Sequence, residues 1–323
     1  MLEFGIIKKL DINLYIYIKS LMFVNNFSTF IFNNLKSKIH ELDKIPDRYQ
    51  HLKDYEFSNW EIAPWDLYIF KDKKIGEGGF SRVYLAYWRG TFVVAKVMNS
   101  KSMKQEGNVL LREIDIMSKL HHPNIVQFLG YVKEPFIIVM EHVGNYNLKD
   151  KVFKLNQRHK INIMKDILKG LVYIHNRRPY NLIHRDIKLT NIILTDSKVA
   201  KITDFGLSTF DNIGNNEPVI NNLNNLNNLG NLYSDELTAV VGTERYLAPE
   251  IRNIQTYNNK IDIYSTGVLL YELFEYKRYI PGGRNRWFWA PRIVKKLVKN
   301  YMLCEDPRDR YSAYMLLNIL NHY

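Results

Sequence analysis

The stretch from Ile183 to Asn191, Ile-His-Arg-Asp-Ile-Lys-Leu-Thr-Asn, concentrates side chains that could do chemistry. Asp186 and Lys188 precede Asn191, and a second carboxylate follows at Asp204 in Thr-Asp-Phe-Gly. Carboxylate and amide oxygens suit Mg²⁺ that bridges nucleotide phosphates. A remaining carboxylate can orient and deprotonate an attacking hydroxyl. The spacing therefore predicts a phosphoryl-transfer site that includes Asp186, Lys188, Asn191 and Asp204.

Two features upstream could hold the phosphates. The run Gly76-Glu-Gly-Gly-Phe-Ser-Arg-Val83 lets the backbone pass close to a phosphate, although such runs are also common turns between strands. It is not a Walker A loop, because no Gly-Lys-Ser/Thr closes it. Lys96 lies in the apolar run Val-Val-Ala-Lys-Val and must either snorkel or find an anionic partner, which Glu113 could supply. Taken alone, such a pair is as compatible with a structural role.

The elements that must position these side chains fall into two groups. Residues 67–71, 82–88, 91–97 and 136–140 are β-branched and aromatic runs that predict strands, the first three antiparallel. Apolar residues at helical spacing predict helices over 109–120, 161–174, 262–274 and 312–320. Strands with one helix, followed mostly by helices, predict an α+β fold with a β-rich lobe and an α-rich lobe.

Together these motifs resemble the eukaryotic-type protein kinases over roughly residues 65 to 322. Ala248-Pro-Glu would close the activation segment, Asp262 would begin a long buried helix, and Arg310 would pair with Glu250. The resemblance implies a bilobal kinase fold, with a small antiparallel β lobe that includes one helix and a larger helical lobe. It implies transfer of the γ-phosphate of ATP to protein hydroxyls, with Mg²⁺. Its catalytic residues would be Asp186, Lys188, Lys96 and Glu113, with Asp186 as the base, and Asn191 and Asp204 would hold the Mg²⁺.

The same resemblance assigns a nucleotide site. The adenine should lie between Val83 and Ala95 on one side and Ile193 on the other. Met140 would be the gatekeeper, and the backbone of Glu141 and Val143 should pair with the adenine edge. The full set of expected nucleotide contacts is Ile75, Gly76, Glu77, Gly78, Gly79, Phe80, Ser81, Arg82, Val83, Ala95, Lys96, Met140, Glu141, Val143 and Ile193.

The branch of the family can be narrowed. Lys188 two residues after Asp186, and Gly242-Thr-Glu-Arg-Tyr-Leu-Ala-Pro-Glu, resemble serine/threonine kinases, and Tyr87-Trp-Arg-Gly is similar to the tyrosine-kinase-like branch. A composition rich in Asn, Ile, Lys and Tyr indicates an AT-rich genome, such as that of an amoeba or a giant DNA virus. The alternative function is a pseudokinase that acts as a nucleotide-binding scaffold; the intact motifs favour the enzyme.

The predicted domains are an extension of unknown role over 1–60 and a kinase domain over 61–323, with an N-lobe at about 65–140 and a C-lobe at about 145–322. An Asn- and Leu-rich insertion interrupts the activation segment at 212–231.

Residues 1–40 are apolar but fit neither a signal peptide nor a spanning helix, so we expect an extension that packs on the main domain, with an interfacial membrane anchor as the alternative. The single cysteine, Cys304, indicates a reducing compartment. We expect a cytoplasmic location, or the host cytoplasm or virion if the source is viral.

Charge is concentrated near the C-terminus. The chain carries a net charge of +12, and residues 277–300 contain eight Lys or Arg and no Asp or Glu. The stretch is either a solvated basic face or a surface that attracts acidic protein substrates. Sequence-specific nucleic-acid binding is not expected, since no recognised motif accompanies the charge.

Overall fold

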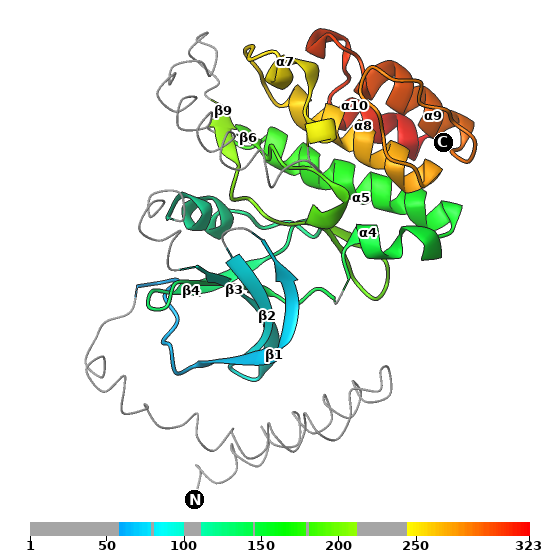
Figure 1. Cartoon of the computed structure of the whole chain (residues 1–323). Helices are drawn as coiled ribbons and strands as arrows, with labels where there is room; N and C mark the ends of the chain where they lie inside the picture. The colour runs from blue at the N-terminus through cyan, green and yellow to red at the C-terminus, as the bar shows by residue number, and fades with distance from the viewer. Residues whose placement is uncertain (1–57, 79–80, 100–110, 145, 179–180, 212–243) are drawn as a thin grey trace, which may run out of the picture. The chain divides into compact units, whose positions relative to one another are not determined.

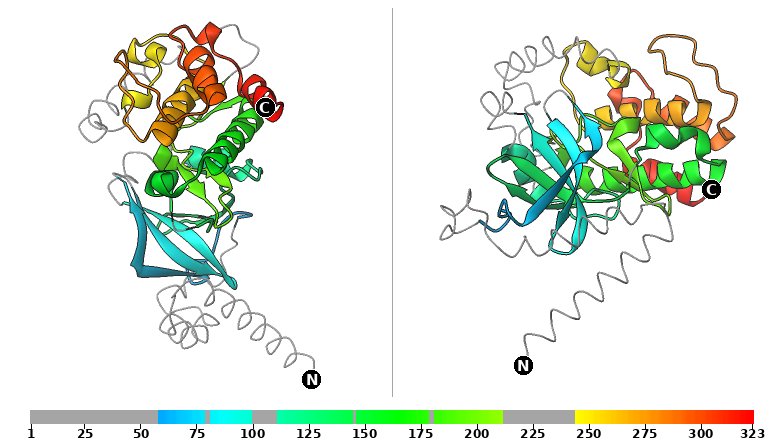
Figure 2. Two further views of the ribbon diagram at one scale, coloured as in Figure 1. Left: turned by 90° about the vertical axis from the view of Figure 1, so that its right-hand side faces the viewer. Right: turned by 60° about the horizontal axis from the view of Figure 1, so that its bottom comes forward.

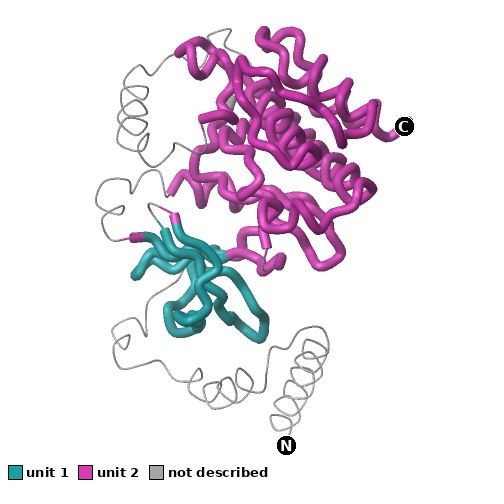
Figure 3. Tube along the Cα trace, turned by 45° about the vertical axis from the view of Figure 1, so that its right-hand side comes forward, with its two compact units in different colours: residues 1–77, 81–98, 130–139 teal, residues 78–80, 99–129, 140–323 magenta. Residues whose placement is uncertain are grey.

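The computed structural model describes residues 58–78, 81–99, 111–144, 146–178, 181–211 and 244–323. These residues divide into two compact units, which Figure 3 colours separately. The first unit contains residues 81–98 and 130–139 and the described residues up to Glu77; the second contains residues 99–129 and 140–323. The predicted extension over 1–60, except its last three residues, and the predicted insertion lie outside the described residues.

A five-stranded sheet carries the N-terminal motifs. Its strands are β1 (Leu67–Glu77), β2 (Ser81–Trp88), β3 (Thr91–Met98), β4 (Phe128–Val132) and β5 (Ile137–Glu141), in the order β1-β2-β3-β5-β4. β1, β2 and β3 are antiparallel, as predicted (Figure 1). Ala86, Val93 and Ala95 are fully buried in this sheet. Val93 and Ala95 are two residues apart on β3 and therefore share its buried face.

Residues 111–118 form a helix that belongs to the second unit. Buried Ile114, Ile116, Met117 and Leu120 mark its packed side, which confirms the predicted periodicity. Glu113 lies among them with 4% of its surface exposed.

Helices make up most of the second unit (Figures 1 and 2). These are α4 (Leu148–Lys151), α5 (Gln157–His175), α7 (Pro249–Arg252), α8 (Lys260–Glu275), α9 (Arg292–Leu297) and α10 (Ala313–Asn321), with short helical turns η2 (Val152–Lys154), η3 (Leu189–Asn191), η4 (Glu244–Tyr246), η5 (Val298–Met302) and η6 (Pro307–Asp309). Every residue of α8 from Ile261 to Glu275 is buried, so this helix forms the centre of the unit. α5 is amphipathic instead, and the Asn156 side chain caps it by accepting a hydrogen bond from the His159 N–H at 2.9 Å.

Two short strand pairs flank the segments that carry the predicted site residues. β6 (Asn181–Ile183) pairs with β9 (Thr209–Asp211), and β7 (Ile192–Leu194) pairs with β8 (Ala200–Ile202), both antiparallel. The Ile183–Asn191 segment connects β6 to β7, and Asp204 follows β8 directly. Within the described residues, no helix is both long enough and apolar enough to span a bilayer.

Candidate active site

Asp186 lies at the centre of a small polar cluster in the second unit. Its Oδ2 accepts hydrogen bonds from the Lys188 Nζ at 2.8 Å and the Asn191 Nδ2 at 2.7 Å. The Asn191 Nδ2 also donates to the Asp186 carbonyl at 2.9 Å, so its amide hydrogens are used within the loop. The Asn191 Oδ1 is therefore the amide atom left to act as a ligand. The structure thus joins three of the predicted site residues in one cluster.

The electrostatics of Asp186 suit a base. Burial raises the pKa of its carboxyl, the charge of Lys188 lowers it, and the nearby charge of Asp204 raises it; the net direction is upward. A carboxylate with a raised pKa accepts a proton more readily than an ordinary aspartate does. The same coupling shows that Asp204 lies close enough to Asp186 for the two charges to interact.

Asp204 adopts a backbone conformation that is rare outside glycine, with φ = 69°. Such strain costs roughly 1–3 kcal/mol, and it persists where the surrounding structure holds it. Phe205 is fully buried and packs edge-on against the His184 ring, with centroids 4.7 Å apart. The His184 Nε2 lies 3.1 Å from the Thr203 carbonyl oxygen. These contacts hold the Asp204 segment against the Asp186 loop and fix the position of the Asp204 backbone, from which the carboxylate extends.

A buried carboxylate on α8 anchors the Asp186 loop from behind. Asp262 is fully buried and accepts the backbone N–H groups of His184 and Arg185, each at 2.8 Å, and contacts the His175 Nε2 at 2.9 Å. Burial raises the pKa of Asp262, but the hydrogen bond from His175 and the neighbouring donors outweigh it and hold the pKa below its usual value. Asp262 thereby stabilises Arg185 at φ = 70°, a second strained residue.

A second buried ion pair anchors the Ala-Pro-Glu segment. Arg310 donates to both carboxylate oxygens of Glu250, at 2.6 and 2.8 Å, with both side chains at most 2% exposed. Arg310 also donates to the carbonyl oxygens of Cys304 and Glu305 at 2.8 and 3.0 Å. This confirms the pairing of Glu250 with Arg310 that the sequence predicted. Because this ion pair is bidentate, it fixes the orientation of α7, which carries Glu250, relative to the segment that carries Arg310.

The glycine-rich run connects β1 to β2, and its Gly78 belongs to the second unit. Gly76 lies opposite Val83 and Glu77 opposite Arg82; Gly79 and Phe80 lie outside the described residues. A Cβ added at Gly78 would meet no atom within 4 Å, and one at Gly76 would make only ordinary contact with Val83. Packing within the protein therefore does not require glycine here, which fits a backbone kept bare for a bound phosphate.

The strand register corrects one predicted nucleotide contact. Val83 lies opposite Lys96 in the β2–β3 ladder, so these two side chains share a face of the sheet. Ala95 lies opposite Tyr84 and is fully buried on the other face. Placing Ala95 beside Val83 was wrong, because neighbouring residues on a strand point to opposite faces. Val94, two residues before Lys96, shares its face; counting by twos from Lys96 would have found it.

The remaining predicted residues are divided between the units. Lys96 is half-buried on β3 in the first unit, while Glu113 is buried in the second, so their ion pair stays a prediction. A Cβ added at Gly206 would lie 3.5 Å from the Glu113 Oε2 and 3.6 Å from the Asp204 Oδ1. Glu113 therefore lies beside the Asp204-Phe-Gly segment.

The predicted adenine-edge residues begin the second unit. The Glu141 N–H donates to the Gln127 carbonyl at 2.9 Å, and its Oε1 accepts from the Gln127 N–H at 2.8 Å and the Lys201 Nζ at 2.7 Å. The N–H and the Oε1 of Glu141 are thus both used in hydrogen bonds within the protein. Ile193 is the half-buried middle residue of β7, between two buried neighbours. The roles of Met140, Val143 and Ile193 in binding adenine stay predictions.

The donor set fits magnesium held together with a nucleotide. In the described part of the chain, no group of three His, Cys, Asp or Glu side chains could hold a metal by itself. Asp204 and Asn191 offer one carboxylate and one amide oxygen, both hard ligands. Phosphate oxygens and water would have to complete an octahedral shell, as is typical of Mg²⁺ bound with a phosphate ester.

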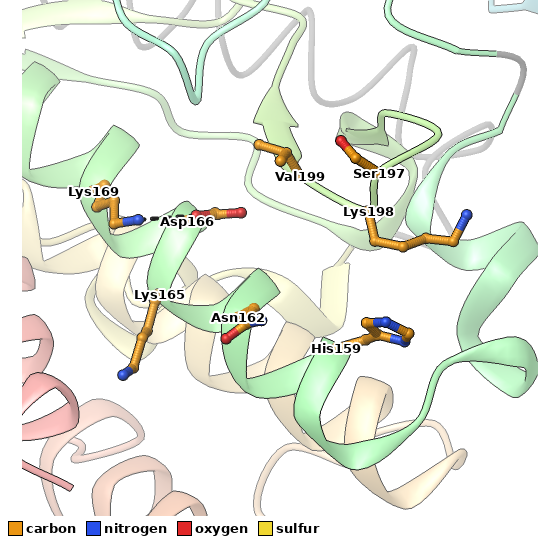
Figure 4. Close-up of a pocket in the computed structure, with 8 residues that line it drawn as sticks. All are labelled: His159, Asn162, Lys165, Asp166, Lys169, Ser197, Lys198 and Val199. Carbon is orange, nitrogen blue, oxygen red and sulfur yellow. Dashed lines mark hydrogen bonds and ion pairs between the residues drawn. The ribbon is translucent and has the colours of Figure 1, made fainter.

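A separate hollow of about 280 Å³ lies between α5 and the β7–β8 turn (Figure 4). The lysines that line it do not converge: Lys169 pairs with Asp166 at 3.2 Å, while Lys165 and Lys198 extend in different directions. Asp166 accepts the Ala200 N–H, which makes it a support for β8. We assign this hollow no role in the chemistry.

Sequence comparison identifies the family. The protein kinase domain family matches residues 69–322, which is most of the chain. The chain belongs to the protein kinases. Members of this family use ATP as the phosphate donor, generally with Mg²⁺, and act on proteins.

Three relatives illustrate the likeness. Serine/threonine-protein kinase VIK of Arabidopsis thaliana is 34% identical over 67% of this chain and 48% of its own length. Serine/threonine-protein kinase CTR1 of the same plant is 34% identical over 71% of this chain and 26% of its own. Seven transmembrane domain-containing tyrosine-protein kinase 1 of Dictyostelium discoideum is 34% identical over 61% and 27%. The chain therefore spans about half or less of the length of these relatives.

Proposed function

We propose that this kinase transfers the γ-phosphate of ATP to serine and threonine hydroxyls of proteins. The observation that carries the proposal is the cluster around Asp186: a buried carboxylate with a raised pKa, fixed by Lys188 and Asn191, in a loop anchored on Asp262. A buried carboxylate is costly, and acceptance of a proton from a hydroxyl accounts for one at this position.

Each residue then has a role. Asp186 accepts the proton of the substrate hydroxyl and orients its oxygen, and Lys188, which lies 2.8 Å from that carboxylate, places a positive charge near the transferred group. Asp204 and Asn191 would hold Mg²⁺, which would neutralise charge on the phosphates. Lys96, supported by Glu113, contacts the phosphates, and the bare backbone at Gly76 and Gly78 approaches them. Positioning and charge neutralisation supply most of the rate enhancement.

The serine/threonine assignment rests on Lys188 and on the segment that ends in Ala248-Pro-Glu, together with relatives named as serine/threonine kinases. One similar protein is named a tyrosine-protein kinase, so tyrosine is the competing acceptor. We assign the chain to the tyrosine-kinase-like branch, a cytoplasmic location and an AT-rich source on sequence grounds alone. The pseudokinase scaffold is disfavoured by the intact Asp186 cluster.

The test is incubation of the purified chain with Mg-ATP and a peptide library, read by mass spectrometry. We expect phosphoserine and phosphothreonine with the wild type and neither with Asp186→Asn. Phosphotyrosine as the main product would overturn the choice of acceptor. Nucleotide binding without any transfer would favour the scaffold.

A further inference from the structure

The last residue of α8 holds a distant loop in place. Glu275 is 1% exposed, and its carboxylate accepts the backbone N–H groups of Phe288 at 2.7 Å, Trp289 at 3.1 Å and Ala290 at 2.9 Å. Three donors compensate a buried negative charge that would otherwise be costly. The backbone of residues 288–290 is therefore fixed against the end of the most deeply buried helix.

The side chains on this fixed backbone extend into solvent. Phe288 is 60% exposed and Trp289 is 65% exposed. A buried carboxylate thus orders a loop that presents two large aromatic groups instead of burying them. Ordering such groups before binding removes part of the entropy cost of an interface, and aromatic side chains are enriched among the residues that dominate binding energy.

A second aromatic pair lies beside the first. Phe153, which is 80% exposed, stacks on Tyr276 with ring centroids 5.2 Å apart and planes inclined by 9°. The Lys160 Nζ lies 3.7 Å from the centre of the Tyr276 ring, and this cation–π contact holds the ring in place.

The two pairs are joined. The Gln157 Nε2 donates to the Trp289 carbonyl at 3.2 Å, and Lys277, next to Tyr276, lies over the Phe288 ring at 5.1 Å. Figure 1 shows the end of α8 beside α4 and the first turns of α5. Phe153, Tyr276, Phe288 and Trp289 form what we name the aromatic patch.

Positively charged residues are frequent in the segments that carry the aromatic patch. Residues 149–160 contain five Lys or Arg and one Asp, and residues 276–290 contain four Lys or Arg and no Asp or Glu. Lys154, Arg158 and Lys277 form no ion pair with any carboxylate that the structure describes. A partner complementary to this surface carries negative charge around a bulky apolar side chain.

We propose that the aromatic patch docks an acidic segment of a protein substrate, in which Asp or Glu residues flank an aromatic or large aliphatic side chain. The proposal rests on the proposed kinase function, because a protein kinase has protein partners that such a segment would hold near Asp186. Docking raises the effective concentration of the phosphorylated site, so it lowers KM and leaves kcat unchanged.

The first experiment measures binding without catalysis. A fluorescent 12-residue peptide with one Trp among Asp and Glu, and with no Ser, Thr or Tyr, is titrated with the full chain and followed by anisotropy. We expect saturable binding, weakened about tenfold or more by Phe153→Ser with Trp289→Ser, and weakened further by high salt. Ile254→Ser is the matched control, since Ile254 is 78% exposed and lies outside the patch; it should bind as wild type does.

A second experiment links docking to turnover. A Ser/Thr peptide is phosphorylated with and without the acidic segment fused to it. We expect the fused peptide to show a lower KM in wild type and no advantage in the double variant, while the short peptide is unaffected by the variant. Turnover of the short peptide reports the proposed function by itself.

Three results would overturn the proposal. They are equal affinity for the acidic peptide and a neutral scrambled peptide, equal affinity of wild type and the double variant, and tighter binding to phosphatidylserine vesicles or an oligonucleotide than to the peptide.

Discussion

At the scale of single residues, Asp186 is the side chain on which the proposed chemistry depends. Asp186→Asn keeps the size of the side chain and removes its ability to accept a proton. We expect turnover to fall by roughly three orders of magnitude or more. The fold should stay intact, because an asparagine at this position keeps part of the hydrogen bonding of Asp186. Steady-state kinetics and circular dichroism check this. The control is Asp196→Asn on the exposed β7–β8 turn; equal activity of wild type and Asp186→Asn would remove the assignment.

The raised pKa of Asp186 predicts the pH dependence. The carboxylate must be ionised to accept a proton, and its pKa lies above the ordinary value of 3.8. We therefore expect kcat/KM to fall as the pH drops through a midpoint higher than 3.8. Lys188→Ala should shift this midpoint further upward, since Lys188 lowers the pKa of Asp186. An acid limb at or below 3.8 in wild type would contradict the structure.

Val94 and Ala95 differ by one position and should respond differently to substitution. Val94 shares a sheet face with Val83 and Lys96, so Val94→Phe should weaken ATP binding about tenfold or more, as measured by calorimetry. Ala95 is fully buried on the other face, so Ala95→Val should lower the free energy of unfolding by about 1–3 kcal/mol and leave ATP affinity close to wild type. The reverse pattern would restore the original assignment of Ala95.

At the scale of elements, α8 organises the catalytic loop through Asp262. Asp262→Asn leaves buried N–H donors without a full set of acceptors and should cost about 3 kcal/mol of unfolding free energy. The lowered pKa gives the sign of the pH effect: the stabilisation is present above 3.8 and is lost as the pH falls toward the folded-state pKa. The difference in the free energy of unfolding between wild type and Asp262→Asn should therefore become smaller below pH 3.8. Urea unfolding measures the free energy of unfolding of both proteins. The control is Asp115→Asn on an exposed helix face, which should change the free energy of unfolding by no more than about 0.5 kcal/mol.

The sequence predicted elements with strong periodicity and missed those held by distant contacts. α5 appears close to its predicted range, because its amphipathic face repeats at 3.6 residues. α8 also appears close to its predicted range, although it is buried on all sides and has no single apolar face. Three-residue strands such as β6 and β8 carry no period, and pairing with partners far along the chain creates them. The candidate site shows the same contrast between residues that the sequence predicted and contacts that it missed. Motif spacing identified Asp186 and Asn191, whereas the contact of Glu275 with residues 288–290 depends on tertiary structure that spacing does not encode.

At the scale of the whole molecule, we expect control by phosphorylation in the activation segment. Ser234 and Thr238 lie outside the described residues, but two arginines lie within them: burial lowers the pKa of Arg112, and the charge of Arg185 lowers it further. A phosphate would relieve this repulsion and order the segment. Ser234→Ala with Thr238→Ala should lower kcat severalfold, as should Arg185→Ala, in a radiolabelled phosphate assay.

The comparison is deletion of residues 221–230, which belong to the predicted Asn- and Leu-rich insertion and lie outside the described residues; a change in insertion length alters closure entropy little. We expect that deletion to leave activity nearly unchanged. Full activity in the double Ala variant would place the control elsewhere.

The buried pair of Glu250 and Arg310 constrains how this chain can diverge. Loss of either partner leaves an uncompensated charge in the interior, at a cost of roughly 3–5 kcal/mol, which is a large share of the stability of an ordinary domain. Replacement of both by apolar residues of similar volume avoids the unpaired charge, and its cost is the loss of the hydrogen bonds that Arg310 donates to the carbonyl oxygens of Lys260, Cys304 and Glu305. The two positions, 60 residues apart, are therefore coupled: each single replacement should cost more stability than the double replacement. Descendants of this sequence should keep or lose the two residues together.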